Sequence, residues 1–186
     1  MFTNVRFIGG VARGDTEYVV TGLAWVGQGG LEGKRMDPTV NINKAVRLAA
    51  ENGRLGVVQA LLAWVGQGEL EGKRVDPTVG NNEAVRLAAE NGYLEVVQAL
   101  LAWVGEGMLE GKRVDPTTKD NYSVRWAAEN GHLEVVKLLF AWVGQGTLEG
   151  KRVDPTAHAN QPLRDVAWNG DLEMVKLLLD WVGEGT

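Results

Sequence analysis

The chain has 186 residues, a formal net charge of −5 and an isoelectric point near 5.1. It contains no cysteine, so disulfides, thiol chemistry and cysteine-bound metals are excluded. The acidic balance argues against nucleic acid as a partner, because binding to phosphates needs a basic face. No apolar run approaches the roughly 18 residues that cross a bilayer, and the first residues do not resemble a signal peptide. We therefore expect an intracellular, cytoplasmic protein that does not contact a membrane.

A repeat of 39 residues organises the chain. Asp-Pro pairs mark its start, at Asp37, Asp76, Asp115 and Asp154, and a tryptophan marks a second position, at Trp25, Trp64, Trp103, Trp142 and Trp181. No insertion or deletion separates the copies. A fixed period of about 20 to 50 residues indicates a repeat array, so we expect one domain over residues 1–186.

The first residues, about 1–36, align without gaps with the second half of a repeat, and their glycines and charges suit an end repeat. Three full repeats follow at about 37–75, 76–114 and 115–153. In the last copy, 154–186, Asp165 and Asp180 replace apolar residues of the other copies. We interpret this copy as a C-terminal cap that presents carboxylates to water.

Each full copy predicts two helices. In the second copy, Ala84–Ala89 gives a short apolar helix, and Asn91-Gly92 ends it because glycine tolerates the left-handed conformation that follows a helix. From Leu94 to Val104, apolar residues recur at spacings of three and four, which indicates a helix with one face packed on a core. The predicted unit is helix, tight turn, helix.

At this point the sequence resembles a known family. The stretch from Ala127 to Leu139, AAENGHLEVVKLL, is similar to the core of the ankyrin repeat, and Pro162-Leu163-Arg164 falls where that family has Pro-Leu-His. The copies are about six residues longer than the usual repeat of about 33, and the extra residues lie in the connection after the second helix. The Asp-Pro-Thr wording is also similar to ankyrin arrays of amoebal viruses and intracellular microbes, whose proteins act in a host cytoplasm.

The resemblance implies an all-α, ankyrin-like helix-turn-helix solenoid with extended loops between repeats. It also implies a non-catalytic module for protein–protein interaction, in which a rigid concave surface loses little entropy on binding. The alternative is a structural or engineered array without a dedicated ligand. A further alternative is an anion or nucleic-acid binder that uses the basic pairs Lys34-Arg35, Lys73-Arg74, Lys112-Arg113 and Lys151-Arg152.

No arrangement of residues predicts catalysis, a cofactor or a metal. The two histidines, His132 and His158, lie at different positions of different repeats, and no Ser/His/Asp set stands apart from the repeating pattern. The glycines around Lys73 miss the spacing of a phosphate-binding loop and follow a helix instead of a strand. We therefore predict that the chain is not an enzyme.

We call the residues at equivalent positions of the repeats a column. Three columns of polar residues are predicted to have structural roles. Carboxylates in the same segment flank each Lys-Arg pair, so we expect self-paired, locally neutral edges. The arginines at the start of the first helix are predicted to brace nearby carboxylates or carbonyls, and they are Arg47, Arg86, Arg125 and Arg164. The asparagines just before them are predicted helix N-caps, and they are Asn43, Asn82, Asn121 and Asn160.

Positions at which the residue varies between copies are the candidate partner-binding positions. Stacking restricts which residues can occupy the core positions, whereas exposed positions are free to change. Aromatic members strengthen this interpretation, since aromatic side chains anchor interfaces. The candidates are Lys44, Glu83, Lys119, Tyr122, Trp126, His158, Gln161 and Trp168. Neutral drift on an exposed face would give the same variation.

The constant tryptophan column has two interpretations. Trp103 lies near the apolar stripe of the second helix, so we expect it to be at least partly buried, with Leu109 from the following loop covering it. Otherwise the tryptophans would form an exposed ridge for a partner or for self-association of a protein that is otherwise a monomer.

Overall fold

The computed structural model describes residues 4–26 and 33–181. Over these ranges the chain consists of paired α-helices joined by turns, and it contains no β-strand. The α-helices are α1 Asn4–Arg13, α2 Thr16–Ala24, α3 Val40–Glu51, α4 Leu55–Ala63, α5 Val79–Glu90, α6 Leu94–Ala102, α7 Thr118–Glu129, α8 Leu133–Ala141, α9 Ala157–Asn169 and α10 Leu172–Asp180. In the described parts of the long connections lie the short 3-10 helices η2 Gly68–Leu70, η3 Gly107–Leu109 and η4 Gly146–Leu148. The predicted all-α fold is confirmed.

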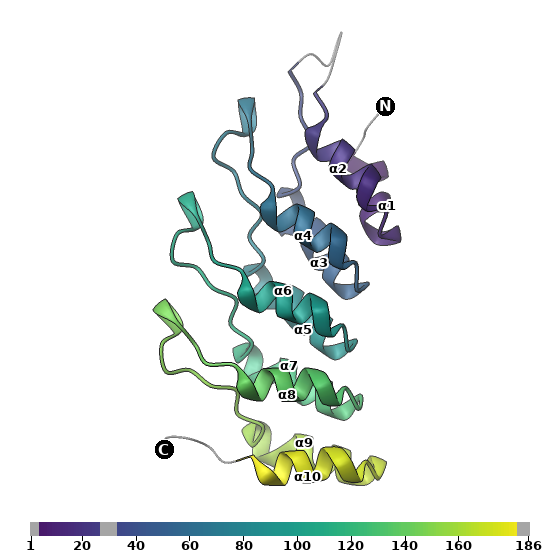
Figure 1. Cartoon of the computed structure of the whole chain (residues 1–186), viewed down its shortest axis with the longest axis vertical. Coiled ribbons are helices and arrows are strands. Elements are labelled where there is room, and N and C mark those ends of the chain that lie inside the picture. Colours follow the sequence, from purple (N-terminus) through teal and green to yellow (C-terminus); the bar gives the residue numbers. More distant parts are fainter. Residues whose placement is uncertain (1–3, 27–32, 182–186) are drawn as a thin grey trace.

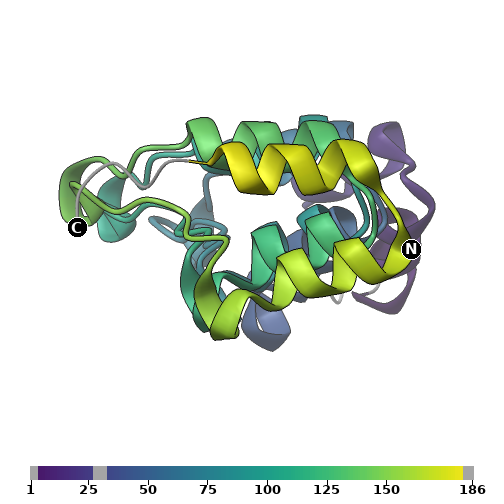
Figure 2. The same ribbon diagram turned by 90° about the horizontal axis from the view of Figure 1, so that it is seen from below.

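The helix pairs stack in chain order into a curved array, with hairpin-like connections fanning out from one edge (Figure 1). Seen from below, the first helices of the pairs form one layer and the second helices form another (Figure 2). Within the first layer α3 packs on α5, α5 on α7 and α7 on α9, and within the second layer α4 packs on α6 and α6 on α8. Each repeat thus contacts its neighbours in sequence, as in a solenoid.

The core lies between the two layers and is continuous along the array. In the second repeat it receives Ala84, Val85 and Ala88 from α5 and Val97 and Leu100 from α6, all fully buried. Small alanines allow the first helices to approach one another closely, and the larger valines and leucines of the second helices fill the remaining space. Since the same columns recur every 39 residues, each new repeat extends the same core.

The tight turn inside each pair depends on glycine. Gly92 has φ +75°, and a Cβ atom at this position would clash with the ring of His132 in the next repeat. Gly53 is in the same position beneath the ring of Tyr93. The glycine therefore ends the helix, as predicted from Asn91-Gly92, and also makes room for the neighbouring repeat.

The connection after each second helix is a hairpin-like loop. Val65 and Arg74 form an isolated antiparallel bridge, and the same bridge joins Val104 to Arg113 and Val143 to Arg152. A backbone hydrogen bond of 2.9 Å from Gly66 to the carbonyl of Lys73 closes this hairpin, and η2 forms its tip. The extra residues of the 39-residue repeat are therefore ordered in the described copies.

The exposed surface of the last helix pair, α9 and α10, carries apolar side chains as well as the carboxylates predicted for a polar cap. Asp180 is exposed and Asp165 is half-buried, but Leu172 and Leu179 of α10 are also exposed. No helix in the described ranges is long and apolar enough to span a membrane.

Candidate partner-binding surface

The first turn of α3, α5, α7 and α9 has a left-handed backbone. Residues 41–43, 80–82, 119–121 and 158–160 all have φ between 52° and 64° and ψ between 33° and 53°. Left-handed backbone costs about 1–2 kcal/mol for each residue that is not glycine, so neighbouring groups must hold these turns in place. Some of the contacts that do so lie within the repeat, and those that cross to the next repeat fall into two sets.

The first set, here named the constant contact, has the same chemistry at the three junctions from α3–α4 to α9–α10. The ammonium of Lys73 lies 2.7 Å from a carboxylate oxygen of Asp37 in the preceding repeat, and Lys112 and Lys151 reach Asp76 and Asp115 at the same distance. The sequence-based expectation that each Lys-Arg pair is neutralised within its own segment was wrong for these lysines. Each lysine extends across the junction, because the stack brings residues 36 apart in sequence together.

The asparagine of each left-handed turn completes the constant contact. The Oδ1 atom of Asn43 accepts the backbone N–H of Asp76 at 3.0 Å, and Asn82 and Asn121 accept from Asp115 and Asp154 at 2.9 Å. These asparagines were predicted to be helix N-caps, and this was wrong. Their side chains satisfy a backbone donor of the next repeat instead of a donor in their own helix.

Burial alone would raise the pKa of Asp76, but its hydrogen bonds to Lys112, to the Thr78 hydroxyl and to the Thr78 backbone N–H outweigh this effect and lower it. The same balance lowers the pKa of Asp37 and of Asp115. All three carboxylates therefore stay ionised well into the acid range, and each Asp-Pro-Thr turn keeps its charged hydrogen bonds.

Arg47, Arg86 and Arg125 brace the left-handed turns, as predicted for this column. Arg86 donates from Nε to the carbonyl of Asn81 at 3.0 Å and from Nη2 to the carbonyl of Gly80 at 3.1 Å. Arg47 donates in the same way to Ile42. The guanidinium thus satisfies carbonyls of a turn whose backbone conformation is otherwise unfavourable.

The second set, here named the variable contact, joins each of these arginines to the next repeat through a different side chain. Arg47 forms an ion pair with Glu83. The guanidinium carbon of Arg86 lies 4.9 Å from the centre of the Tyr122 ring, and Arg125 donates to Gln161 at 3.4 Å. Three of the predicted partner-binding residues, Glu83, Tyr122 and Gln161, therefore contact the arginine of the preceding repeat. The contacts are an ion pair, a cation–π contact and a neutral hydrogen bond, respectively.

Tyr122 has a further set of partners. Its hydroxyl donates to the carboxylate of Glu90 at 2.8 Å, and its ring centre lies 5.6 Å from that of Trp126. Burial and the bond to Glu90 raise the pKa of Tyr122 to about 12, although Arg86 and Arg125 oppose the shift. The phenol is therefore neutral and half-buried, and Tyr122 and Trp126 form a small aromatic cluster on α7.

The contacts of His132 are structural. Its Nε2 atom lies 3.0 Å from the carbonyl of Glu90, an acceptor, so Nε2 carries the proton and donates. Asn130 donates to the same carbonyl at 3.0 Å. His132 thus satisfies the end of α5 in the preceding repeat.

The remaining predicted site residues lie at the surface. Lys44, Lys119 and His158 are exposed, and Trp168 on α9 is 91% exposed. Positions 44, 48 and 51 of α3 follow the spacing of one helical face, and so do 83, 87 and 90 of α5, 122, 126 and 129 of α7, and 161, 165 and 168 of α9. We name this stripe, together with the left-handed turns, the first-helix face.

The tryptophans of the constant column are partly buried. Trp64, Trp103 and Trp142 pack against the hydrophobic core, so the expectation of at least partial burial of Trp103 is confirmed. Leu70 of the neighbouring loop is buried, whereas Leu109 and Leu148 are half-buried. Direct cover of Trp103 by Leu109 stays a prediction.

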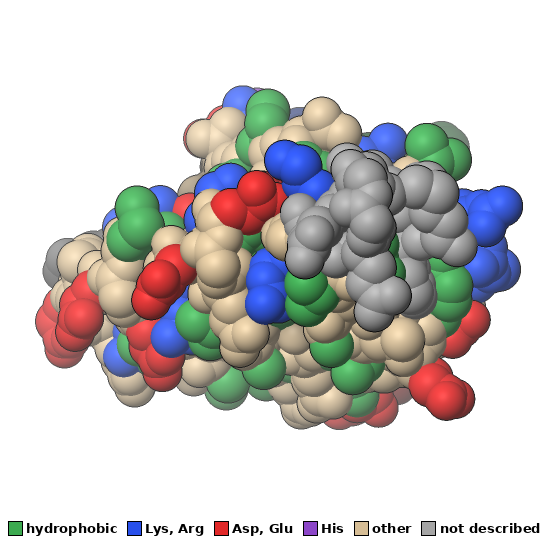
Figure 3. Space-filling model, turned by 90° about the horizontal axis from the view of Figure 1, so that it is seen from above, with side chains coloured by type: hydrophobic (Ala, Val, Ile, Leu, Met, Phe, Trp, Pro, Cys, Tyr) green, Lys and Arg blue, Asp and Glu red, His purple; other side chains and the backbone are tan. Residues whose placement is uncertain are grey.

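Charges of both signs are interspersed on the face of the molecule seen from above (Figure 3). The four lysines of the Lys-Arg pairs lie against carboxylates, since Lys34 reaches Glu69 at 3.6 Å and the other three take part in the constant contact. Across the described residues no three His, Asp or Glu side chains form a group that could hold a metal ion. The lysines are thus already neutralised and do not form a basic ladder.

The stacked helix pairs and their hairpin-like connections define the class: a repeat protein of the helix-turn-helix solenoid type. Residues 88–184, more than half of the chain, match the family model of ankyrin repeats in three copies. The chain therefore belongs to the ankyrin repeat family. Comparison with curated proteins gives no match.

Membership of this family carries a general function. Ankyrin repeats are generally modules for protein–protein interaction, and the family is typically non-catalytic. Protein partners are therefore implied for the chain.

Proposed function

We propose that this chain is a non-catalytic interaction module that binds a protein partner through the first-helix face. The observation that carries the proposal is Trp168, whose indole is 91% exposed on a helix held in a rigid array. Exposure of so large an apolar group to water is unfavourable, and tryptophan is among the residues that most often anchor protein interfaces.

The chemical character of the first-helix face changes along the array. In α3 and α5 its three positions are charged or aliphatic, with Leu48 and Leu87 at the centre of each stripe. In α7 and α9 they include Tyr122, Trp126 and Trp168. The proposed contact is therefore centred on the two C-terminal repeats, with exposed Lys119 and His158 beside it.

The repeats themselves supply substitutions that test this proposal without disturbing the fold. Trp126→Leu restores the residue of the two preceding repeats at that position, and Trp168→Glu restores the glutamate of all three. The double variant should keep the melting temperature of the wild type. A matched control, Gln59→Ala with Gln98→Ala, changes exposed residues on the second helices.

Affinity capture from a lysate of the source cells, read by mass spectrometry, compares the three proteins. We expect proteins that the wild type and the control retain and that the double variant loses. Equal capture by all three would place the binding surface elsewhere. Capture of nothing by the wild type would instead support an array without a dedicated ligand.

A further inference from the structure

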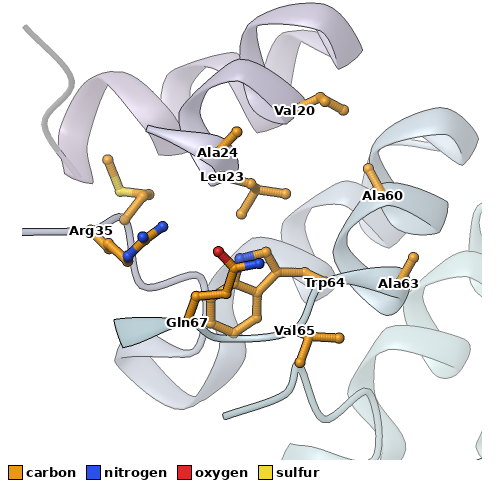
Figure 4. A pocket seen from close by; sticks show the side chains of 10 residues that line it. Val20, Leu23, Ala24, Arg35, Ala60, Ala63, Trp64, Val65 and Gln67 are labelled. Carbon is orange, nitrogen blue, oxygen red and sulfur yellow. The ribbon is translucent and has the colours of Figure 1, made fainter. Parts of the chain in front are cut away.

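A row of three clefts lies between the end of one second helix and the hairpin of the next repeat, and no residue of the first-helix face lines them. The first cleft, of about 400 Å³, is lined by Ala24, Arg35, Trp64, Val65 and Gln67 among others. In Figure 4, Arg35 and Gln67 face each other, while Leu23 and Ala24 of α2 lie across from Trp64.

The other two clefts repeat the first at the period of the sequence. The second, of about 300 Å³, is lined by Ala63, Arg74, Trp103, Val104 and Glu106. The third, of about 260 Å³, is lined by Ala102, Arg113, Trp142, Val143 and Gln145. Each cleft therefore combines an apolar wall, which includes an indole, with one guanidinium.

The middle cleft differs from its neighbours in one residue, and this residue indicates what the clefts can bind. Nη2 of Arg74 lies 3.0 Å from a carboxylate oxygen of Glu106, so this cleft carries its own anion. In the first and third clefts the same position is Gln67 or Gln145, which is neutral. Arg35 and Arg113 form no ion pair within the described residues.

We propose that the first and third clefts bind two carboxylates of one extended, acidic segment of a partner protein, and that this segment runs along the hairpin edge. Arg35 and Arg113 would each pair with a carboxylate, as Arg74 does with Glu106. Apolar side chains next to these carboxylates would lie against Trp64 and Trp142. This surface is separate from the first-helix face.

The period of the array fixes the spacing of the two carboxylates. Neighbouring helices pack about 8–10 Å apart and an extended chain covers about 3.3–3.6 Å per residue, so clefts two repeats apart match carboxylates about five or six residues apart. The net charge of −5 repels a uniformly charged polyanion such as nucleic acid. Two carboxylates set among apolar residues fit this edge better.

A synthetic peptide with two glutamates at this spacing, each beside a valine or a leucine, tests the proposal by fluorescence anisotropy. The matched control peptide has glutamine in place of both glutamates. We expect the glutamate peptide to bind at least about tenfold more tightly, as for loss of a charge-assisted contact of about 1.4 kcal/mol. Equal affinity of the two peptides, or no binding of either, would overturn the proposal.

The ion pair of the middle cleft suggests a variant that tests the proposal directly. Gln145→Glu should reproduce the Arg74–Glu106 pair in the third cleft, neutralise Arg113 and weaken the glutamate peptide about tenfold, with an unchanged melting temperature. Arg113→Gln should have the same effect, and the Trp126→Leu, Trp168→Glu variant should bind the peptide like the wild type. Undiminished binding by Gln145→Glu, or full displacement of the peptide by an equal concentration of single-stranded DNA, would contradict this assignment.

Discussion

Neighbouring repeats are joined by the constant contact and by the variable contact, and the two differ in how they use sequence. The constant contact has the same lysine, aspartate and asparagine at the three junctions between full repeats. In the variable contact an arginine at the same position of each repeat meets a different partner, which is Glu83, Tyr122 or Gln161. The aspartates and asparagines of the constant contact are buried or half-buried and are held by several hydrogen bonds in one geometry, so this contact sets the register, although its lysines are exposed. The partly exposed variable contact tolerates several chemistries, which leaves its face free to acquire a partner.

The largest expected effect is acid sensitivity, because three carboxylates of the constant contact act together. The folded-state pKa values of Asp37, Asp76 and Asp115 are lowered below 3.8. Their contribution to stability is therefore complete above the unfolded pKa and is lost as the pH falls through the lower folded values. Urea titrations between pH 5 and pH 2 should show a falling free energy of unfolding. The Asp76→Asn, Asp115→Asn variant should be less stable at pH 5 and lose less on acidification; an unchanged slope would contradict this account.

The next effect concerns the asparagine of the constant contact. Asn82→Ala leaves the backbone N–H of Asp115 buried without an acceptor, so we expect a loss of about 1–3 kcal/mol in the free energy of unfolding. The amide of Asp115 should also exchange its hydrogen faster than in the wild type. Asn81→Ala, one residue earlier in an exposed position, is the matched control. An equal loss in both variants would point to the left-handed backbone instead of the side-chain acceptor.

A smaller gain is expected in the left-handed turn of the first full repeat. Ile42 has φ +57° and is 68% exposed, so a β-branched side chain there adds strain without packing. Ile42→Asn, the residue of the second repeat at this position, should raise the free energy of unfolding by about 0.5–1 kcal/mol. Ile42→Val retains the branch and should give no gain. Loss of stability in Ile42→Asn would show that the isoleucine packs favourably.

The smallest effect belongs to the variable contact. The bond from Arg125 to Gln161 is long at 3.4 Å and partly exposed, so Gln161→Ala should cost less than about 0.5 kcal/mol. A cost as large as that of Asn82→Ala would remove the distinction between the two contacts. The comparison needs only thermal or urea unfolding of both variants under one set of conditions.

Much of the fold could be predicted from the sequence, because local periodicity encodes it. The spacing of Leu94, Val97 and Leu100 predicted α6, and Asn91-Gly92 predicted the turn before it. The left-handed turns were missed, since the second repeat alone has a glycine there, Gly80, and the first has Asn41, Ile42 and Asn43 instead. Here contacts with other repeats override local preference.

The candidate surface was predicted in part. Sequence variation identified the first-helix face, but it could not separate Tyr122, which contacts Arg86 and Glu90, from the fully exposed Trp168. Cross-repeat pairs such as Lys112 and Asp76 lie 36 residues apart, and no local pattern indicates them. These pairs could have been found from the sequence because both the lysine and the aspartate are the same in every full repeat. This observation becomes informative once the stacking of the repeats is known.

A double-mutant cycle on Lys112 tests most directly the claim that contacts across junctions join the repeats. Lys112→Met and Asp76→Asn should show a coupling energy of about 0.5–1.5 kcal/mol in urea unfolding, because Lys112 donates to Asp76 at 2.7 Å. The parallel cycle of Lys112→Met with Asp115→Asn, its neighbour within the same segment, should be additive within about 0.3–0.5 kcal/mol. Coupling to Asp115 without coupling to Asp76 would contradict the account.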